Sequence, residues 1–377
     1  MDIGFQKTVV FLIFIFIGFL LKAKFKSKEE VIGIKKIILN LALPATIFIA
    51  LLGIQIELNL LLLPVLALGL NLLLFLVFPL VLSFLGIKKE TPEFRTARLL
   101  VPSLAPGLSC FPFVLEFLGK DYLAKAAMAD LGNKVFVLIF LYLIAMNWYF
   151  KKQNKKQERS YSKISAMLKA MVSEPVNLFI AVALLLLAFG INMDAMPFVF
   201  GETLKKSSLI MTPLVLLFIG LAVKIKKRQF LQIFSLLFVR AGLVFTICGI
   251  FVVTTGLQAK NDILLLLAFG LSACSFWPYA HISSIESLEV DLKTKKRTFQ
   301  NNYAISILAM SFPLSTVLVL SVLNSDSFFS STQNIFLIAG ALFFFGLLSP
   351  FIYWLKKTTK IQKLLSLKLG SPATKHI

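Results

Sequence analysis

Long apolar stretches separated by short polar segments make up most of the chain. Each stretch is close to the roughly 20 residues that an α-helix needs to cross a bilayer. The stretches are apolar on every face, whereas a membrane-spanning strand alternates apolar and polar residues over about 9–11 positions. The pattern therefore predicts an all-α polytopic membrane protein. The eleven stretches are residues 5–22, 32–54, 58–86, 95–119, 122–150, 174–192, 204–224, 229–256, 262–286, 299–324 and 332–355.

The composition agrees with a chain that lies in lipid. Of the 377 residues, 58% are hydrophobic and 15% are charged, against about 45–50% and about 25% in soluble domains. These values exclude a soluble enzyme, a disordered protein and a nucleic-acid-binding domain. Membrane lipid is the expected surrounding, and nucleic acid is not an expected partner. No glycine-rich phosphate loop follows a strand, so we expect no cofactor.

Lysine and arginine alternate between the two sides of the predicted helices, and the net charge is +21. The loops after the first, third, fifth, seventh and ninth stretches and the C-terminal tail together hold 28 of these residues, whereas the opposite side holds only five. Cytoplasmic loops carry the excess of positive charge in membrane proteins. We therefore predict an outside N-terminus and a cytoplasmic C-terminus in a plasma membrane or bacterial inner membrane.

The longest basic segment separates five stretches from five more. An odd number of helices gives the halves opposite orientations, and inverted repeats recur in secondary transporters. Prolines support this symmetry, because Pro44 and Pro213 are 169 residues apart and Pro112 and Pro278 are 166 apart. The predicted parts are a first five-helix repeat at 1–150, a cytoplasmic basic loop at 151–173, a second, inverted repeat at 174–325, and an extra helix with a basic tail at 326–377.

The fourth and ninth stretches cannot be regular helices. The fourth contains Pro102, Pro106 and Pro112, and the ninth contains Pro278. Proline removes a backbone donor, and unpaired backbone at membrane depth is tolerated only where it lines protein or water. Paired interruptions in two halves point to a transport site, whose half-helix N-termini suit an anion. The alternative is that the prolines only kink packed helices.

Small and polar residues near the interruptions are the candidate substrate contacts. Some would shape the site and expose backbone groups, and the asparagines would donate hydrogen bonds to the substrate. The first group is Gly107, Ser109, Pro112, Ser272, Ser275 and Pro278, and the second is Asn133, Asn301 and Asn302.

Ionisable residues within the stretches are costly in lipid and are functional candidates. Asp130 and Lys134 lie at i and i+4 of the fifth stretch. They either neutralise each other or form a proton- or sodium-coupling carboxylate held by a lysine. Arg240 lies near the middle of the eighth stretch, too deep to reach the cytoplasm easily. It is either the counter-ion of a substrate carboxylate or the partner of Asp130 or Glu116.

Two further ionisable residues follow the prolines. Glu116 comes one turn after Pro112 and lies either within the membrane or at its outer mouth. His281 is either a hydrogen-bonded structural residue or a proton carrier. The candidates for ion or proton coupling are therefore Glu116, Asp130, Lys134 and His281. The cysteines near the interruptions show no repeated metal-ligand spacing, so no metal site is predicted.

Several short segments resemble the auxin efflux carrier family, which includes plant auxin exporters and bacterial dicarboxylate permeases, and the related bile acid–sodium symporter type of inverted-repeat transporter. The likeness is spread over about residues 8–320. The segments that carry it are Leu43-Pro44-Ala45-Thr46-Ile47-Phe48, Gly107-Leu108-Ser109-Cys110-Phe111-Pro112, Asp130-Leu131-Gly132-Asn133, Ser275-Phe276-Trp277-Pro278 and Arg240.

The resemblance implies a ten-helix inverted repeat whose fourth and ninth helices cross at Pro112 and Pro278 near the bilayer midplane. Helices 1, 2, 6 and 7 would form a scaffold, which is often dimeric, and helices 3–5 and 8–10 a mobile transport domain. Two departures concern the site, because Ala105 and Cys110 stand where the family commonly has asparagine and glycine. The eleventh stretch would be an extra span.

These observations predict a permease and not an enzyme. The preferred function is secondary-active transport of a small organic anion, such as a dicarboxylate or an auxin-like acid, by elevator-type alternating access in a homodimer, with H⁺ or Na⁺ as a possible coupling ion. One alternative is a sodium- or proton-coupled ion symporter or antiporter that uses Asp130 and Glu116. Others are a membrane-embedded acyltransferase that uses His281, and a structural or sensory membrane protein.

Overall fold

The structure, a computed structural model, describes residues 3–25, 27–53, 58–153, 175–222, 230–291 and 297–348. Over these ranges the regular elements are helices, and no strand occurs. Six of the helices are long and apolar enough to cross a membrane, and three shorter apolar ones accompany them. The predicted all-α integral membrane protein is therefore confirmed. The six are Glu29–Leu52, Leu60–Phe84, Lys120–Gln153, Phe198–Leu221, Phe230–Thr255 and Asn301–Leu323, and the shorter three are Gln6–Leu21, Pro175–Ala188 and Thr332–Leu348.

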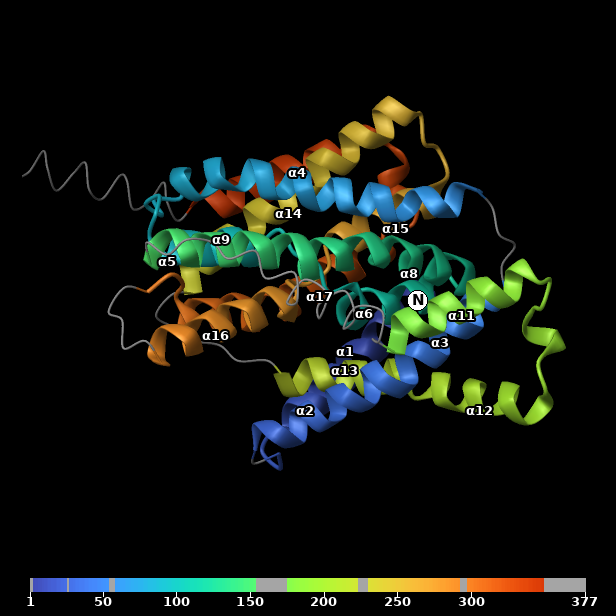
Figure 1. The fold of residues 1–377 in the computed structure, drawn as a ribbon. Helices are drawn as coiled ribbons and strands as arrows, with labels where there is room; N and C mark the ends of the chain where they lie inside the picture. Colours follow the sequence, from blue (N-terminus) through green and yellow to red (C-terminus); the bar gives the residue numbers. More distant parts are fainter. Residues whose placement is uncertain are drawn as a thin grey trace, which may run out of the picture.

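Each apolar stretch corresponds to one helix or to a series of consecutive helical segments (Figure 1). The elements before residue 154 are α1 (Ile3–Leu21), α2 (Lys28–Ile37), the π-helical turn η1 (Ile38–Ala42), α3 (Leu43–Leu52), η2 (Leu58–Leu62), α4 (Leu63–Phe84), α5 (Pro92–Leu100), α6 (Pro106–Ser109), α7 (Phe111–Phe117), α8 (Lys120–Val135), the π-helical turn η3 (Phe136–Phe140) and α9 (Leu141–Gln153). The later elements are α11 (Pro175–Ala188), η4 (Met193–Ala195), α12 (Phe198–Leu209), α13 (Met211–Ala222), α14 (Phe230–Thr255), α15 (Lys260–Gly270), α16 (Phe276–Asp291), α17 (Asn301–Leu323), η6 (Phe328–Ser330) and a last helix over Thr332–Leu348.

The helices form two groups. In the first, α1 packs along α13, and α3 packs against α11 and α12. In the second, α4 packs against α8, while α14 contacts α4, α15 and α17, and α16 contacts α9 and α17. Figure 1 shows α1, α12 and α13 of the first group along the lower side of the view, and α4, α14 and α15 of the second group in its upper part. The two groups meet chiefly where α3 packs against α8.

The fourth and ninth stretches are both interrupted. Residues 101–105 separate α5 from α6, and residues 271–275 separate α15 from α16. Pro106, Pro112 and Pro278 lie in the first turns of α6, α7 and α16, where a backbone N–H has no partner within the helix in any case. These prolines therefore begin the helices that follow each interruption.

The last helix packs on α14 through small residues of both partners. A Cβ added to Gly242 would lie 3.1 Å from the ring of Phe343, and one added to Gly249 would lie 3.0 Å from the ring of Phe336. Gly346 approaches the Val239 backbone in the same way. The eleventh stretch is therefore attached to the second group of helices.

The predicted division of the chain is only partly covered by the structure. Nearly all of the basic loop predicted at 151–173 and the tail beyond residue 348 lie outside the described residues. The division into two repeats, a loop and a tail stays a prediction.

Glycine permits the closest helix contact of the first group. A Cβ on Gly220 of α13 would lie 2.0 Å from the carbonyl oxygen of Ile15, and one on Gly18 of α1 would lie 2.3 Å from the carbonyl oxygen of Leu217. No side chain fits at either position unless the two backbones move apart. Small residues allow such close approach in membrane helix pairs.

We predict that Gly220→Ala destabilises the protein by about 1–3 kcal/mol, because the added methyl group overpacks a backbone contact. The measurement is the thermal unfolding midpoint of the detergent-solubilised protein. Gly69→Ala is the matched control, since Gly69 lies inside α4 with nothing within 4 Å of an added Cβ, and alanine is the better helix former. Equal midpoints for the two variants would contradict the close α1–α13 contact.

Candidate functional site

The two interruptions lie against each other and exchange hydrogen bonds. The Ala105 N–H donates to the Ala273 carbonyl at 2.8 Å, and the Ala273 N–H donates to Ser109 Oγ at 2.8 Å. The Ser275 N–H donates to Ser103 Oγ at 2.9 Å. Each interruption therefore satisfies backbone groups that the other leaves without a helical partner, as buried backbone requires. We call this contact between residues 101–105 and 271–275 the crossing. It is centred on Ala105 and Ala273 and lies on the N-terminal side of Pro112 and Pro278, the residues at which the resemblance placed it.

Arg240 of α14 joins the same crossing from one side. Its side chain is buried, and Nη2 donates to the carbonyls of Ser272 at 2.7 Å and Ser103 at 3.4 Å. Both carbonyls follow the C-terminal ends of α5 and α15, where helix dipoles concentrate negative charge. Of the two alternatives for Arg240, the pairing with Asp130 or Glu116 is not the one seen, because the guanidinium bonds to backbone oxygens of the two interruptions. The alternative of a counter-ion for a substrate carboxylate stays a prediction.

A cavity of about 90 Å³ lies beside the crossing. Its walls come from both groups of helices. Among the described residues, the lining has one carboxylate, Asp130, and two lysines, Lys35 and Lys134. It is lined by Lys35, Leu39, Leu43, Leu104, Ala105, Pro106, Gly107, Leu108, Asp130, Asn133, Lys134, Val137, Val176, Ser275, Phe276 and Trp277.

Asp130 is held by two neighbours on α8. Its Oδ1 accepts a hydrogen bond from Asn133 Nδ2 at 2.8 Å, and its Oδ2 lies 3.5 Å from Lys134 Nζ. Lys134 also donates to Asn177 Oδ1 of α11 at 2.7 Å. Asp130 and Lys134 are both buried. The pair therefore neutralises itself and also lines the cavity, while a role of Asp130 in ion or proton coupling stays a prediction.

Asn133 connects this pair to the crossing. Its Nδ2 also donates to the Leu104 carbonyl at 3.1 Å, and its Oδ1 accepts from Asn71 Nδ2 of α4 at 3.0 Å. The side-chain amide therefore caps a carbonyl of the first interruption while it orients Asp130. Asn133 is the one predicted asparagine that lines the cavity.

The other predicted asparagines lie elsewhere. Asn301 begins α17 and donates to the Glu286 carboxylate of α16, and Asn302 is exposed. Two residues of α17 bond to the second interruption. Ser311 Oγ accepts the Cys274 N–H at 3.2 Å, and Ser315 Oγ donates to the Leu271 carbonyl. Ten helical residues separate Asn301 from Ser311, about 15 Å. Neither asparagine is among the residues that line the cavity, and their predicted hydrogen bonds to the substrate stay a prediction.

His281 has a structural partner. Its Nε2 lies 2.9 Å from the Val137 carbonyl, and its ring packs edge-on against Tyr142. A carbonyl only accepts, so Nε2 carries the proton in this contact. Val137 belongs to the π-helical turn η3, in which backbone bonds run from i to i−5. The contact agrees with the interpretation of His281 as hydrogen-bonded structure that ties α16 to the fifth stretch.

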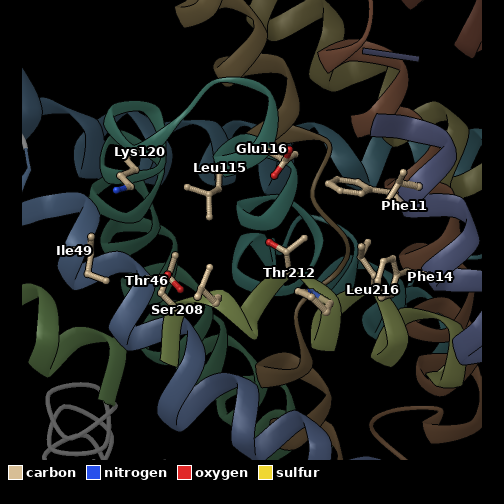
Figure 2. A pocket seen from close by; sticks show the side chains of 13 residues that line it. Phe11, Phe14, Thr46, Ile49, Leu115, Glu116, Lys120, Ser208, Thr212 and Leu216 are labelled. Atoms are coloured by element: carbon tan, nitrogen blue, oxygen red, sulfur yellow. The ribbon is translucent and has the colours of Figure 1, made fainter. Parts of the chain in front are cut away.

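Glu116 lies at a second cavity, of about 420 Å³ (Figure 2). Its exposed carboxylate is 3.5 Å from Lys7 Nζ of α1, and it does not line the cavity that contains Asp130. Figure 2 shows Glu116, Lys120 and Thr212 facing this cavity from three different helices. The remaining lining residues are Val10, Phe11, Phe14, Thr46, Ile49, Leu115, Ser208, Leu209, Pro213 and Leu216. We take the smaller cavity as the candidate functional site because it combines buried charge with the interrupted helices.

The structure adds four residues that the sequence interpretation did not select. Ser103 Oγ accepts a backbone N–H in the crossing. Asn71 and Asn177 bond to Asn133 and Lys134 and complete the polar network around Asp130. Lys35 lines the cavity. Asn71 interrupts a leucine-rich stretch, which was a usable signal because amides are costly in lipid. Among the described residues, no three His, Cys, Asp or Glu side chains are grouped so as to hold a metal ion.

No protein-family model and no curated protein matches this chain. The resemblance to the auxin efflux carrier family therefore stays a prediction that rests on the short segments quoted above.

We predict that Arg240→Met lowers stability by about 2–4 kcal/mol, because it leaves two buried carbonyls without donors. The thermal unfolding midpoint of the solubilised protein measures this. Thr246→Val on the same helix is the control, since the Thr246 hydroxyl bonds only within its own helix, to the Gly242 carbonyl. An Arg240→Met variant as stable as this control would contradict the role of Arg240 at the crossing.

Proposed function

We propose that the protein is a secondary-active transporter of a small organic anion, with its binding site in the cavity beside the crossing. The observation that carries the proposal is the combination found there. Two interrupted helices lie next to a buried carboxylate and two lysines. Interrupted helices and intramembrane charges are the features by which transport sites are built.

An inverted repeat of ten helices is the proposed architecture. The contact of α1 with α13 joins the first and seventh stretches, and the contact of α3 with α11 joins the second and sixth. If the first stretch corresponds to the sixth and the second to the seventh, the contact between stretches 1 and 7 has the contact between stretches 6 and 2 as its symmetric counterpart. The bonds Ser109–Ala273 and Ser103–Ser275 span 164 and 172 residues, which bracket the proline offsets of 166 and 169. These relations support two repeats at 1–150 and 174–325.

Alternating access then takes a definite form. The group of α1, α3, α11, α12 and α13 acts as the scaffold, and the group that contains the crossing carries the substrate past it. The α3–α8 interface is the sliding surface, because Asp130, Asn133 and Lys134 lie on α8 and face the cavity across it. Dimerisation through the scaffold is the arrangement that the family resemblance suggests.

The polar network supplies a route to proton coupling. In the unloaded site, Lys134 is paired with Asp130. When Asp130 takes up a proton, its charge is lost and the Lys134 ammonium becomes available to a substrate carboxylate. One proton and one carboxylate then enter together, and the buried charge stays balanced, as a low-dielectric site requires. The charged groups that share the cavity with Asp130 are Lys134 and Lys35.

Uptake by purified protein in liposomes, with an imposed proton gradient and a panel of mono- and dicarboxylates, tests the proposal. We expect saturable uptake of at least one acid. Lys134→Gln is expected to lower kcat/KM about 30-fold, the equivalent of losing a charge-assisted hydrogen bond of about 2 kcal/mol. Lys125→Gln is the control, because Lys125 lies on the same helix in an ion pair with Asp262 that does not line the cavity.

Sodium or proton flux that needs no acid would contradict the organic-anion proposal. It would favour the alternative of an ion symporter or antiporter on the same scaffold.

A second prediction concerns coupling. Asp130→Asn cannot exchange a proton, but its amide keeps a side-chain oxygen for Asn133. We expect uptake by this variant to lose its dependence on the proton gradient while exchange of acid across the membrane persists. The measurement is uptake with and without a pH gradient, compared with acid-for-acid exchange. A gradient dependence equal to that of the natural protein would exclude Asp130 as the coupling group.

A further inference from the structure

Lys35 is a second cation at the cavity. It belongs to α2, within the long apolar helix Glu29–Leu52, and it lines the cavity beside the crossing. Its Nζ lies 3.6 Å from the centroid of the Phe276 ring. Phe276 is the first residue of α16 and follows the second interruption directly. An ammonium over an aromatic face is a favourable cation–π contact.

The two lysines of the cavity differ in their partners. Lys134 is engaged by Asp130 and Asn177. Lys35 is held by the ring face of Phe276, and it forms no ion pair with a carboxylate of the described residues. A cation–π contact is worth about 0.5–2 kcal/mol, which is less than a desolvated ammonium gains from an anion. Lys35 is therefore the cation that an incoming anion can take over most easily.

The charge balance of the cavity leads to one kind of ligand. With Asp130 protonated, the lining carries two ammonium groups and the N-terminal end of α16, and no negative charge. Of the buried Lys134 and the half-buried Lys35, a monoanion neutralises one ammonium and leaves the other without a counter-charge. A dianion neutralises both, and buried charges are stable only when they are paired.

We infer that Lys35 is the specificity-determining residue that makes the site prefer a doubly charged acid to a singly charged one; this inference rests on the proposed transport function. Lys134 takes one carboxylate and Lys35 takes the other. Lys35 lies on α2, which continues into α3 of the scaffold within the helix Glu29–Leu52, and Lys134 lies on α8. The dianion therefore also joins the scaffold to the group that carries the site.

Competition between matched acids tests this role. In liposomes that carry the purified protein, uptake of a transported acid from the panel is inhibited with succinate and with butyrate, which share a four-carbon chain. We expect the natural protein to bind succinate at least tenfold more tightly than butyrate. Lys35→Gln should bring this ratio close to one by weakening succinate alone, and Lys35→Arg should keep the preference.

Lys36→Gln is the matched control, since Lys36 is the exposed neighbour of Lys35 and does not line the cavity. An unchanged ratio in Lys35→Gln, an equal change in Lys36→Gln, or no preference in the natural protein would each overturn the inference. Thermal unfolding of each variant confirms that it is folded. These outcomes differ from a failure of the proposed function, in which the natural protein transports no acid at all.

Discussion

Backbone groups inside a bilayer have no water to bond with, and each one left unpaired costs several kcal/mol. Two interrupted helices are therefore tolerated only if something replaces the lost helical bonds. In this protein the two interruptions supply part of that replacement to each other, through Ala105, Ala273 and the hydroxyls of Ser103 and Ser109, and side chains of α8, α14 and α17 supply more of it. Neither interruption would be stable alone at this depth, so the crossing is a single unit built from two distant segments.

Arg240 and Lys134, two buried cations of the second helical group, differ in their partners. Arg240 lies where two helices end, and its guanidinium satisfies carbonyls from both. Its planar fork of donors suits this task, because one group can reach two acceptors at once. Lys134 lies beside a carboxylate and a cavity, and a lysine ammonium is a mobile point charge. The first residue holds the structure, and we propose that the second binds substrate.

Irregular backbone surrounds the cavity on more than one side. Besides the two interruptions, the π-helical turns η1 and η3 contribute Leu39 and Val137 to its lining. Such turns are common at functional sites. In each, the backbone N–H of residue i bonds to the carbonyl of residue i−5 instead of i−4. The Val137 carbonyl is bonded by His281. The cavity therefore lies where four segments of the chain depart from regular α-helix at a similar level.

Local physical chemistry determined much of this protein from sequence alone. The lengths of the apolar stretches predicted the positions of the helices, since crossing lipid requires about 20 apolar residues. Prolines in the fourth and ninth stretches predicted the interrupted segments. The Asp130–Lys134 pair followed from helical spacing, because residues at i and i+4 share a face. Partners far apart in the chain were decided only by the tertiary structure. Arg240 bonds to Ser103, 137 residues away, Lys35 lies over the ring of Phe276, and Ser311 accepts a hydrogen bond from Cys274. No local pattern encodes such contacts, because they depend on how the helices pack in space.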